Sequence, residues 1–304
     1  MTKLCLGTVQ FGMKYGVNNQ IGRQPTWQES FEMLDYALEN GIDTIDTARA
    51  YGEAELVLGE YFKNRTDKKN NVKVISKLRP NVIDEGVDIE KVVIDECKNT
   101  LSRLNLDRLN GYLLHTPEYI YNKGILSALQ ELKSKNYVDN IGVSIYDLKE
   151  GLEAIKTGVI DYIQLPYSVL DQRGSKADFF EKVKQEHITV FTRSAFLQGL
   201  FMMDENSIPK HLVDAVSYIK IFEEVRKKYG LSKSEALINF VKSEKDIDYL
   251  VFGVEKKEQL IEDINVYNKE IDVLDFVNEI KEKIDNVDKS IIFPSLWSNG
   301  KKAE

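Results

Sequence analysis

The chain has 304 residues, which is enough for two average domains or for one α/β barrel. Hydrophobic residues make up 42% and charged residues 30% of it, a balance that is typical of a soluble fold with a sizeable core and excludes a disordered chain. The net charge of −8 argues against a nucleic-acid surface, because phosphate binding needs a concentrated basic face.

The first segment, MTKLCLGTVQFG, lacks the long apolar stretch of a signal peptide, and no segment reaches the roughly 18 consecutive apolar residues of a membrane span. Cys5 and Cys97 are far apart and lack metal-ligand spacing, so we expect both to pack in the core of a protein from a reducing compartment. The sequence therefore predicts a cytoplasmic protein with no nucleic-acid or membrane partner.

Short apolar, β-rich runs alternate along the chain with longer amphipathic segments, which is typical of a parallel sheet with crossover helices. We predict eight strands, at residues 4–8, 44–47, 72–77, 111–115, 140–144, 162–165, 189–193 and 249–253. We predict helices at residues 26–40, 54–63, 89–104, 122–135, 147–156, 177–186, 210–229 and 257–268.

No linker or composition shift divides these eight units, so one domain is expected. A doubly wound open sheet is the alternative, but it usually carries a GxGxxG fingerprint after its first strand, and the segment from Gly7 to Gly12 lacks that spacing. We therefore predict a single-domain (β/α)8 TIM barrel over residues 1–304, with a C-terminal helix and tail from about residue 270.

Polar side chains follow several of the predicted strands, and barrel enzymes carry their chemistry at these carboxyl ends. Lys77 needs a partner if it is buried, and Asp46 on the neighbouring strand is the natural one. An ammonium beside Tyr51 would lower the phenol pKa from about 10 toward the working range, which would make Tyr51 a usable acid. His115 could polarise a carbonyl oxygen. Each residue also has a structural interpretation, as a strand-joining ion pair, a packed ring or a buried histidine.

Metal-site patterns are missing from the sequence. It contains no HExxH motif, no Cys pair and no carboxylate cluster with metal spacing, so no metal site is predicted and a metal-dependent barrel hydrolase is disfavoured. A barrel isomerase or lyase should carry a phosphate-binding glycine pair after strands seven and eight, and only Gly253 is present there.

The segments GIDTIDTARAYGEAE, VISKL, LLHTP, IGVS and YIQLPYS together resemble the aldo-keto reductase family, over nearly the whole chain. The most specific match is the pattern DTAxxYG followed by Glu55. The resemblance implies an NAD(P)-dependent oxidoreductase that reduces a small aldehyde or ketone, or runs the reverse alcohol oxidation. It places four residues at the catalytic positions of the family, with the tyrosine as general acid: Asp46, Tyr51, Lys77 and His115.

The resemblance also implies a nicotinamide cofactor extended across the barrel mouth. Ser144 and Gln164 match residues that bind the carboxamide, and Ile145 stands where Asn is frequent, so this contact would depend more on Gln164. The expected cofactor-binding residues are Gly7, Thr8, Ser144, Gln164, Arg193, Ser194, Leu197, Gly199, Gly253, Lys256, Gln259, Glu262 and Asp263.

The segment FGVEKKEQL is similar to the family's PGASRPEQL segment and bears on the choice of cofactor. Lys256 stands where an arginine often meets the adenosine 2′-phosphate, which favours NADP(H) over NAD(H). Glu255 could instead bind a free ribose hydroxyl and repel that phosphate. Gln259, Glu262 and Asp263 face the adenine end in the family, or form a solvated helix face.

Arg193 departs from the family, where an aromatic ring often stacks under the nicotinamide. Its guanidinium could stack there, reach the pyrophosphate, or form an anion site for substrate with Arg49 and Arg79. The residues expected near substrate are Arg49, Tyr146, Tyr167 and Phe196, together with the tail around Phe293 and Trp297.

The expected partner is a small-molecule carbonyl compound, and the expected assembly is a monomer or a small homo-oligomer. The alternative function is a nicotinamide-sensing regulatory protein with little turnover, against which the intact set of four catalytic residues argues.

Overall fold

Eight parallel strands close into one barrel in sequence order, and β8 pairs with β1. The structure is a computed structural model and describes residues 1–69 and 71–300. The predicted (β/α)8 barrel is therefore confirmed, and residues 301–304 of the predicted tail lie outside the described part. The strands are β1 Lys3–Gly7, β2 Thr44–Asp46, β3 Lys73–Leu78, β4 Leu109–Leu114, β5 Val138–Ser144, β6 Tyr162–Pro166, β7 Thr189–Arg193 and β8 Tyr249–Gly253.

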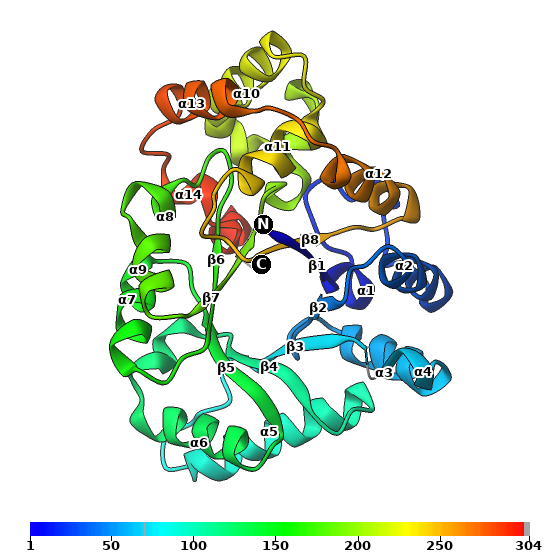
Figure 1. The fold of residues 1–304 in the computed structure, drawn as a ribbon, viewed down its shortest axis with the longest axis vertical. Helices are drawn as coiled ribbons and strands as arrows, with labels where there is room; N and C mark the ends of the chain where they lie inside the picture. The colour runs from blue at the N-terminus through cyan, green and yellow to red at the C-terminus, as the bar shows by residue number, and fades with distance from the viewer. Residues whose placement is uncertain (70, 301–304) are drawn as a thin grey trace.

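Helices surround the ring of strands (Figure 1). Several begin at capping boxes, such as Thr26 with Glu29 and Asp147 with Glu150, whose side chains satisfy the first free backbone N–H groups. The α-helices are α1 Val9–Gly12, α2 Trp27–Glu39, α3 Ala54–Asn64, α4 Thr66–Lys69, α5 Ile89–Leu104, α6 Lys123–Ser134, α7 Leu148–Thr157, α8 Arg173–Lys176, α9 Phe179–Gln185, α10 Val216–Lys228, α11 Lys233–Lys242, α12 Lys257–Asn268, α13 Leu274–Lys283 and α14 Lys289–Ile292. No helix in this described part is long and apolar enough to cross a membrane.

The connection between β7 and β8 differs from the prediction. The helix predicted at residues 210–229 begins as a 3-10 turn, Lys210–Ala215, and continues as α10, which packs against α13 outside the barrel. A further helix, α11, was not predicted, although it packs against α12 and leads into β8. The capping box of Ser232 and Glu235 was the sequence signal for it.

The interior of the barrel contains an apolar cluster, formed by Cys5, Ile75, Leu113, Phe191 and Val251. Because side chains alternate along a strand, the residues two positions further on also face the barrel interior, one step closer to its mouth. Those residues are Gly7, Lys77, His115, Arg193 and Gly253. The alternation of the strands thus presents these five residues together above an apolar floor. Cys5 and Cys97 are buried free thiols, as predicted.

Candidate active site

A cavity of about 670 Å³ opens at the carboxyl ends of the strands. It is lined by residues at or after the ends of six of the eight strands and by residues of the C-terminal tail. The predicted site residues that line it are Gly7, Thr8, Asp46, Tyr51, His115, Ser144, Tyr146, Arg193, Ser194, Phe196, Leu197, Gly199, Gly253, Lys256, Gln259, Glu262 and Asp263.

A buried lysine connects two of the predicted catalytic residues below this cavity. Lys77 Nζ donates to Asp46 Oδ1 and Oδ2, at 2.7 Å each, and to Tyr51 Oη at 3.2 Å. The side chain of Lys77 is fully buried and that of Asp46 is 4% exposed. A buried ammonium needs partners of this kind to offset its desolvation. The three residues therefore form one connected proton-handling group.

Burial and the neighbouring charges shift the pKa values of Lys77 and Tyr51 in opposite directions. Burial alone would lower the pKa of Lys77, but Asp46 and Tyr51 raise it, so its net pKa lies above the usual value. Burial raises the pKa of Tyr51, and Lys77 offsets only part of this increase. The expectation that Tyr51 has a lowered pKa is therefore wrong, because the sequence shows the neighbouring charge but not the depth of burial.

The ring of His115 lies edge-on to Tyr51, with 5.8 Å between ring centroids. Burial, together with the positive charges of Lys77 and Arg193, lowers the pKa of His115 to about 3. The imidazole is therefore neutral throughout the physiological range. Its Nδ1 is buried and has no hydrogen-bond partner among the residues that the structure describes.

This lowered pKa predicts a pH-dependent stability. Unfolded His115, with a pKa near 6.5, binds a proton that the folded protein excludes, so stability is complete above about pH 6.5 and falls as the pH drops toward about 3. We expect wild type to lose about 2 kcal/mol of unfolding free energy between about pH 7 and pH 5 that His115→Asn does not lose. Urea denaturation at each pH measures this, with His187→Asn, at an exposed histidine, as the control. Equal pH dependence in wild type and His115→Asn would contradict the burial of a neutral imidazole.

Gln164 has a different place from the one expected. Its Nε2 donates to Asp46 Oδ1 at 2.7 Å, and its Oε1 accepts from Ser144 Oγ at 3.2 Å. Ser144 lines the cavity, whereas Gln164 is buried beneath it. Gln164 therefore holds Asp46 and Ser144 in place, and Ser144 is the residue of the two that a cofactor in the cavity would meet.

Two of the residues expected near substrate lie outside the cavity. Tyr167 is fully buried and stacks on Phe240, with 5.4 Å between centroids, so it belongs to the core between the barrel and its helices. Arg49 is only partly buried and is not among the lining residues. The contact of these two residues with substrate is therefore not supported, whereas Tyr146 and Phe196 do line the cavity.

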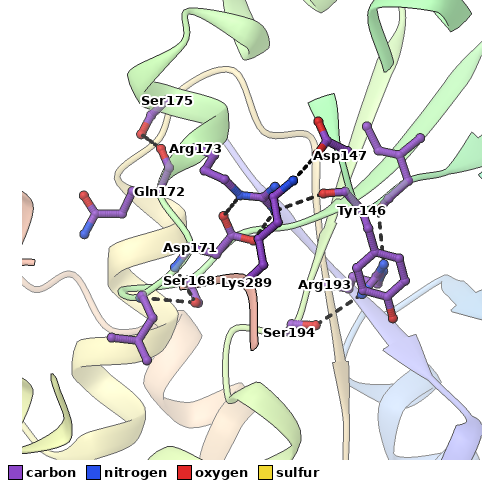
Figure 2. A network of polar contacts seen from close by, with 12 residues as sticks. Tyr146, Asp147, Ser168, Asp171, Gln172, Arg173, Ser175, Arg193, Ser194 and Lys289 are labelled. Atoms are coloured by element: carbon purple, nitrogen blue, oxygen red, sulfur yellow. Dashed lines mark hydrogen bonds and ion pairs between the residues drawn. The ribbon is translucent and has the colours of Figure 1, made fainter. Parts of the chain in front are cut away.

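The expected anion site of three arginines is not formed. Arg79 pairs with Glu96 at 3.1 Å, Arg49 lies outside the cavity lining, and only Arg193 faces the cavity. Arg193 Nη2 donates to the Ile145 carbonyl at 3.1 Å, and the guanidinium lies 4.2 Å from the centroid of the Tyr146 ring (Figure 2). Stacking on Tyr146 thus fixes the guanidinium at the wall of the cavity.

The C-terminal tail packs against Tyr146 and forms part of the same cavity wall. The Phe293 ring lies 5.1 Å from that of Tyr146 and 4.7 Å from the Arg173 guanidinium, which also pairs with Asp171. Figure 2 shows Lys289 of α14 reaching Asp147 beside this cluster. Pro294 and Ser295 line the cavity, whereas Trp297 is buried and donates to the Ile291 carbonyl. The tail therefore contributes to the site through residues next to Phe293.

The loop after β7 turns sharply at the cavity. Ser194, Leu197 and Gln198 have positive φ angles of 69°, 45° and 55°, and Gly199 follows at 86°. Left-handed backbone is strained in residues other than glycine, so the surrounding packing must hold this loop. A Cβ at Gly199 would lie 2.9 Å from Cβ of Asn18, which explains the glycine.

Residues 13–25, which we name the strap, form a part of the site that the sequence analysis missed. They connect α1 to α2, and their backbone and side chains meet the loop after β7: Val17 N donates to the Gln198 carbonyl at 3.0 Å and Gln198 Nε2 donates to Tyr15 Oη at 2.9 Å. Burial raises the pKa of Tyr15, and Tyr51 lies close enough to raise it further. The signal was the length of the segment, because most loops of this kind have about 2–6 residues.

The other end of the strap meets the segment after β8. Gln20 N donates to Glu255 Oε1 at 2.7 Å, and Lys256 Nζ donates to Gln20 Oε1 at 2.9 Å. Glu255 is 6% exposed and also receives Gln259 Nε2 at 3.4 Å. The strap therefore joins the loops after β7 and β8 across the cavity.

Acidic side chains dominate this end of the cavity. Glu255, Glu262 and Asp263 all line it, and Ser234 Oγ donates to Glu262 Oε1 at 2.8 Å. Burial, with a contribution from Glu262, raises the pKa of Asp263 to about 8. Asp263 is thus mostly protonated at neutral pH and can donate a hydrogen bond.

Comparison with known proteins agrees with this fold. The sequence model of the Aldo/keto reductase family matches residues 3–285. The NADH-specific methylglyoxal reductase of Escherichia coli is 22% identical, over 88% of this chain and 94% of its own length. An aldo-keto reductase of Bacillus subtilis is 24% identical, over 76% of each chain. The holo form of an aldo-keto reductase from Bacillus halodurans superposes with a TM-score of 0.76 at 19% identity, over 95% of both chains.

A closed (β/α)8 barrel with a cavity at the carboxyl ends of its strands is typical of barrel enzymes, and the family match over residues 3–285 makes the assignment specific. The chain belongs to the aldo-keto reductase family and is an oxidoreductase of the kind that reduces carbonyl compounds.

Proposed function

We propose that the protein reduces a small aldehyde or ketone with a reduced nicotinamide cofactor, or oxidises the corresponding alcohol, and that Tyr51 is the general acid. The observation that carries the proposal is the contact of Lys77 Nζ with both Asp46 and Tyr51 Oη beneath the cavity. A structural ion pair would not need a phenol as its third member at the edge of an open cavity.

The cavity has the volume and the chemistry that an extended dinucleotide requires. Its volume of about 670 Å³ lies within the range of small-molecule sites. Ser144 would hold the carboxamide, the loop after β7 the pyrophosphate, and Glu255 with Gln259 the adenosine ribose. A Cβ at Gly253 would lie 2.6 Å from Gln10 Oε1, so this glycine leaves room for the Gln10 side chain at the cavity wall where β8 ends.

The residues of the chain then have distinct tasks. A bound reduced nicotinamide would supply the hydride to the carbonyl carbon. Tyr51 Oη donates its proton to the carbonyl oxygen, and the Lys77 ammonium stabilises the phenolate that remains. Asp46 keeps Lys77 charged and in position. Neutral His115 can hydrogen-bond the carbonyl oxygen and orient it toward Tyr51.

A turnover assay tests this function. Purified protein is incubated with NADH or NADPH and a panel of small carbonyl compounds that includes methylglyoxal, and oxidation of the cofactor is followed by absorbance. We expect turnover with at least one carbonyl compound. Tight cofactor binding without turnover of any compound would instead favour the nicotinamide-sensing role.

We propose further that NADH is the preferred cofactor, although Lys256 favoured NADPH in the sequence. The Glu255 carboxylate is buried at the cavity wall, while the Lys256 ammonium is already bound to Gln20. A buried carboxylate repels a phosphate but accepts a hydrogen bond from a ribose hydroxyl. The NADH-specific relative from Escherichia coli supports the same choice.

Two substitutions test whether Glu255 or Lys256 determines the choice between NADH and NADPH. We expect Glu255→Ser to shift the ratio of the NADPH and NADH dissociation constants about tenfold toward NADPH, because it removes about 1.4 kcal/mol of repulsion. We expect Lys256→Ala to leave that ratio within about twofold, since its ammonium is bound to Gln20 at an exposed position, where charge contacts are weak. Cofactor fluorescence titrations measure both. A selective loss of NADPH affinity in Lys256→Ala would restore the interpretation that Lys256 meets the 2′-phosphate.

A further inference from the structure

A second ion pair, with a buried carboxylate and a partly buried guanidinium, lies behind the catalytic group and takes no part in the proposed reaction. Glu55, in the first turn of α3, has a side chain that is 1% exposed. Its Oε2 accepts from Arg103 Nε of α5 at 2.9 Å, and its Oε1 accepts from Ser76 Oγ of β3 at 2.8 Å. Neither Glu55 nor Arg103 lines the cavity. Replacing such a pair by apolar residues is often neutral or stabilising, so stability alone does not account for it.

Both partners of Glu55 lead directly to catalytic residues. Arg103 Nη2 donates to the carbonyl of Gly52 at 3.3 Å, and Gly52 follows Tyr51 in the chain. Ser76 precedes Lys77 on β3, and the alternation of the strand turns Ser76 outward to Glu55 while Lys77 points into the barrel. One carboxylate thus joins the turn that carries Tyr51 to the strand that carries Lys77.

The same turn is held from its other side by α1. Glu53 N donates to the Gly12 carbonyl at 3.1 Å, and a Cβ at Gly12 would lie 1.7 Å from the carbonyl oxygen of Tyr51. Gly52 itself has a φ of 56°, in the left-handed region. The turn is therefore confined between α1 and α5, and of these two contacts the one with α5 is made by a side chain, which a substitution can remove.

We propose that the Arg103–Glu55 ion pair is a positioning element that holds the Tyr51 hydroxyl at the Lys77 ammonium. This inference rests on the proposed role of Tyr51 as the acid. If the turn loosens, Tyr51 Oη spends less time at 3.2 Å from Lys77 Nζ, and proton transfer slows while the cofactor site is unchanged. Arg103 and Glu55 act only through Tyr51 and Lys77, so they are not catalytic residues.

The pH dependence of alcohol oxidation should change when the contact between Tyr51 and Lys77 weakens. The groups that face Tyr51 are Lys77 from β3, Asp46 from β2, His115 after β4, Arg193 of β7 and Tyr15 of the strap. Lys77 is the first of the charges that lower the pKa of Tyr51, so a weaker contact with it raises that pKa. Alcohol oxidation, which needs the phenolate as base, should then require a higher pH.

The test compares Arg103→Met with a matched control, Arg65→Met. Arg65 makes a comparable pair with Asp35, at 2.8 Å, just past the other end of α3, and within the described part of the chain it makes no hydrogen bond or ion pair to the Tyr51 turn. We expect Arg103→Met to lower kcat about tenfold, to keep the KM for cofactor within about twofold, and to raise the apparent pKa of alcohol oxidation. Arg65→Met should show none of these changes, and Arg103→Lys should recover part of kcat.

Hydrogen exchange of residues 48–53 supplies a readout that does not depend on activity. We expect faster exchange there in Arg103→Met than in Arg65→Met, with both variants folded by circular dichroism. If Arg103→Met exchanged faster at residues 48–53 but kept the kcat and the pH profile of wild type, the pair would have only a structural role and the proposal would be overturned. Unchanged exchange at these residues in Arg103→Met would also overturn it. A wild type without turnover would refute the proposed function instead, and the exchange comparison alone would then decide whether the pair holds the turn.

Discussion

Replacing Tyr51 by phenylalanine is expected to lower kcat for carbonyl reduction by at least about 100-fold, while the dissociation constant for the cofactor stays within about twofold. The phenol contributes a proton, and its Oη contacts Lys77 Nζ at 3.2 Å, whereas the cavity residues expected to hold the dinucleotide follow β1, β5, β7 and β8. Steady-state kinetics with a saturating carbonyl compound and a cofactor titration of the same preparation measure both quantities.

The matched control for this substitution is Tyr61→Phe. Tyr61 is also a buried tyrosine whose hydroxyl meets a charged side chain, since Oη donates to Asp35 Oδ1 at 2.7 Å. It lies on α3 itself, where its ring packs against Phe31 of α2, and it does not line the cavity. We expect Tyr61→Phe to lose some stability and keep its kcat. If Tyr51→Phe retained more than about a tenth of wild-type kcat, Tyr51 would be part of the cavity wall and another group would have to donate the proton.

The places of the catalytic residues could be predicted because they follow from local patterns. Lys77 and His115 lie two positions beyond Ile75 and Leu113, so strand alternation alone turns them into the barrel mouth. The same alternation accounts for a wrong expectation, since Tyr167 lies three positions after the inward-facing Gln164 and therefore points outward into the core.

What the sequence did not show are contacts between segments that are distant in the chain. Gln164 meets Asp46 across 118 positions, and Gln20 of the strap meets Glu255 across 235 positions. No local period encodes such pairs, because they depend on how loops of irregular backbone fold over the barrel mouth. The pKa of Tyr51 was misjudged for a related reason, since burial is a property of the assembled fold.

Substitutions in the buried Asp46–Lys77 pair should separate its contribution to stability from its contribution to chemistry. Lys77→Met leaves the Asp46 carboxylate buried, with Gln164 Nε2 as its remaining side-chain donor. We expect this to reduce the free energy of unfolding by about 3 kcal/mol or more, because an uncompensated buried charge is strongly destabilising. The double variant Asp46→Leu/Lys77→Met, in which both charges are gone, should recover much of that loss.

A second lysine on β3, Lys73, provides the control. Lys73 of β3 pairs at 2.9 Å with Asp43, which precedes β2, but both side chains are more than 40% exposed. Lys73→Met should therefore change stability by less than about 1 kcal/mol. Urea denaturation of the four proteins with a common m-value gives the comparison. A Lys77→Met variant no less stable than Lys73→Met would show that Asp46 and Lys77 are not energetically coupled. If instead the double variant regains stability but has no carbonyl reductase activity, the ion pair is not required for folding, and its place beneath Tyr51 is explained by the proton transfer that it supports.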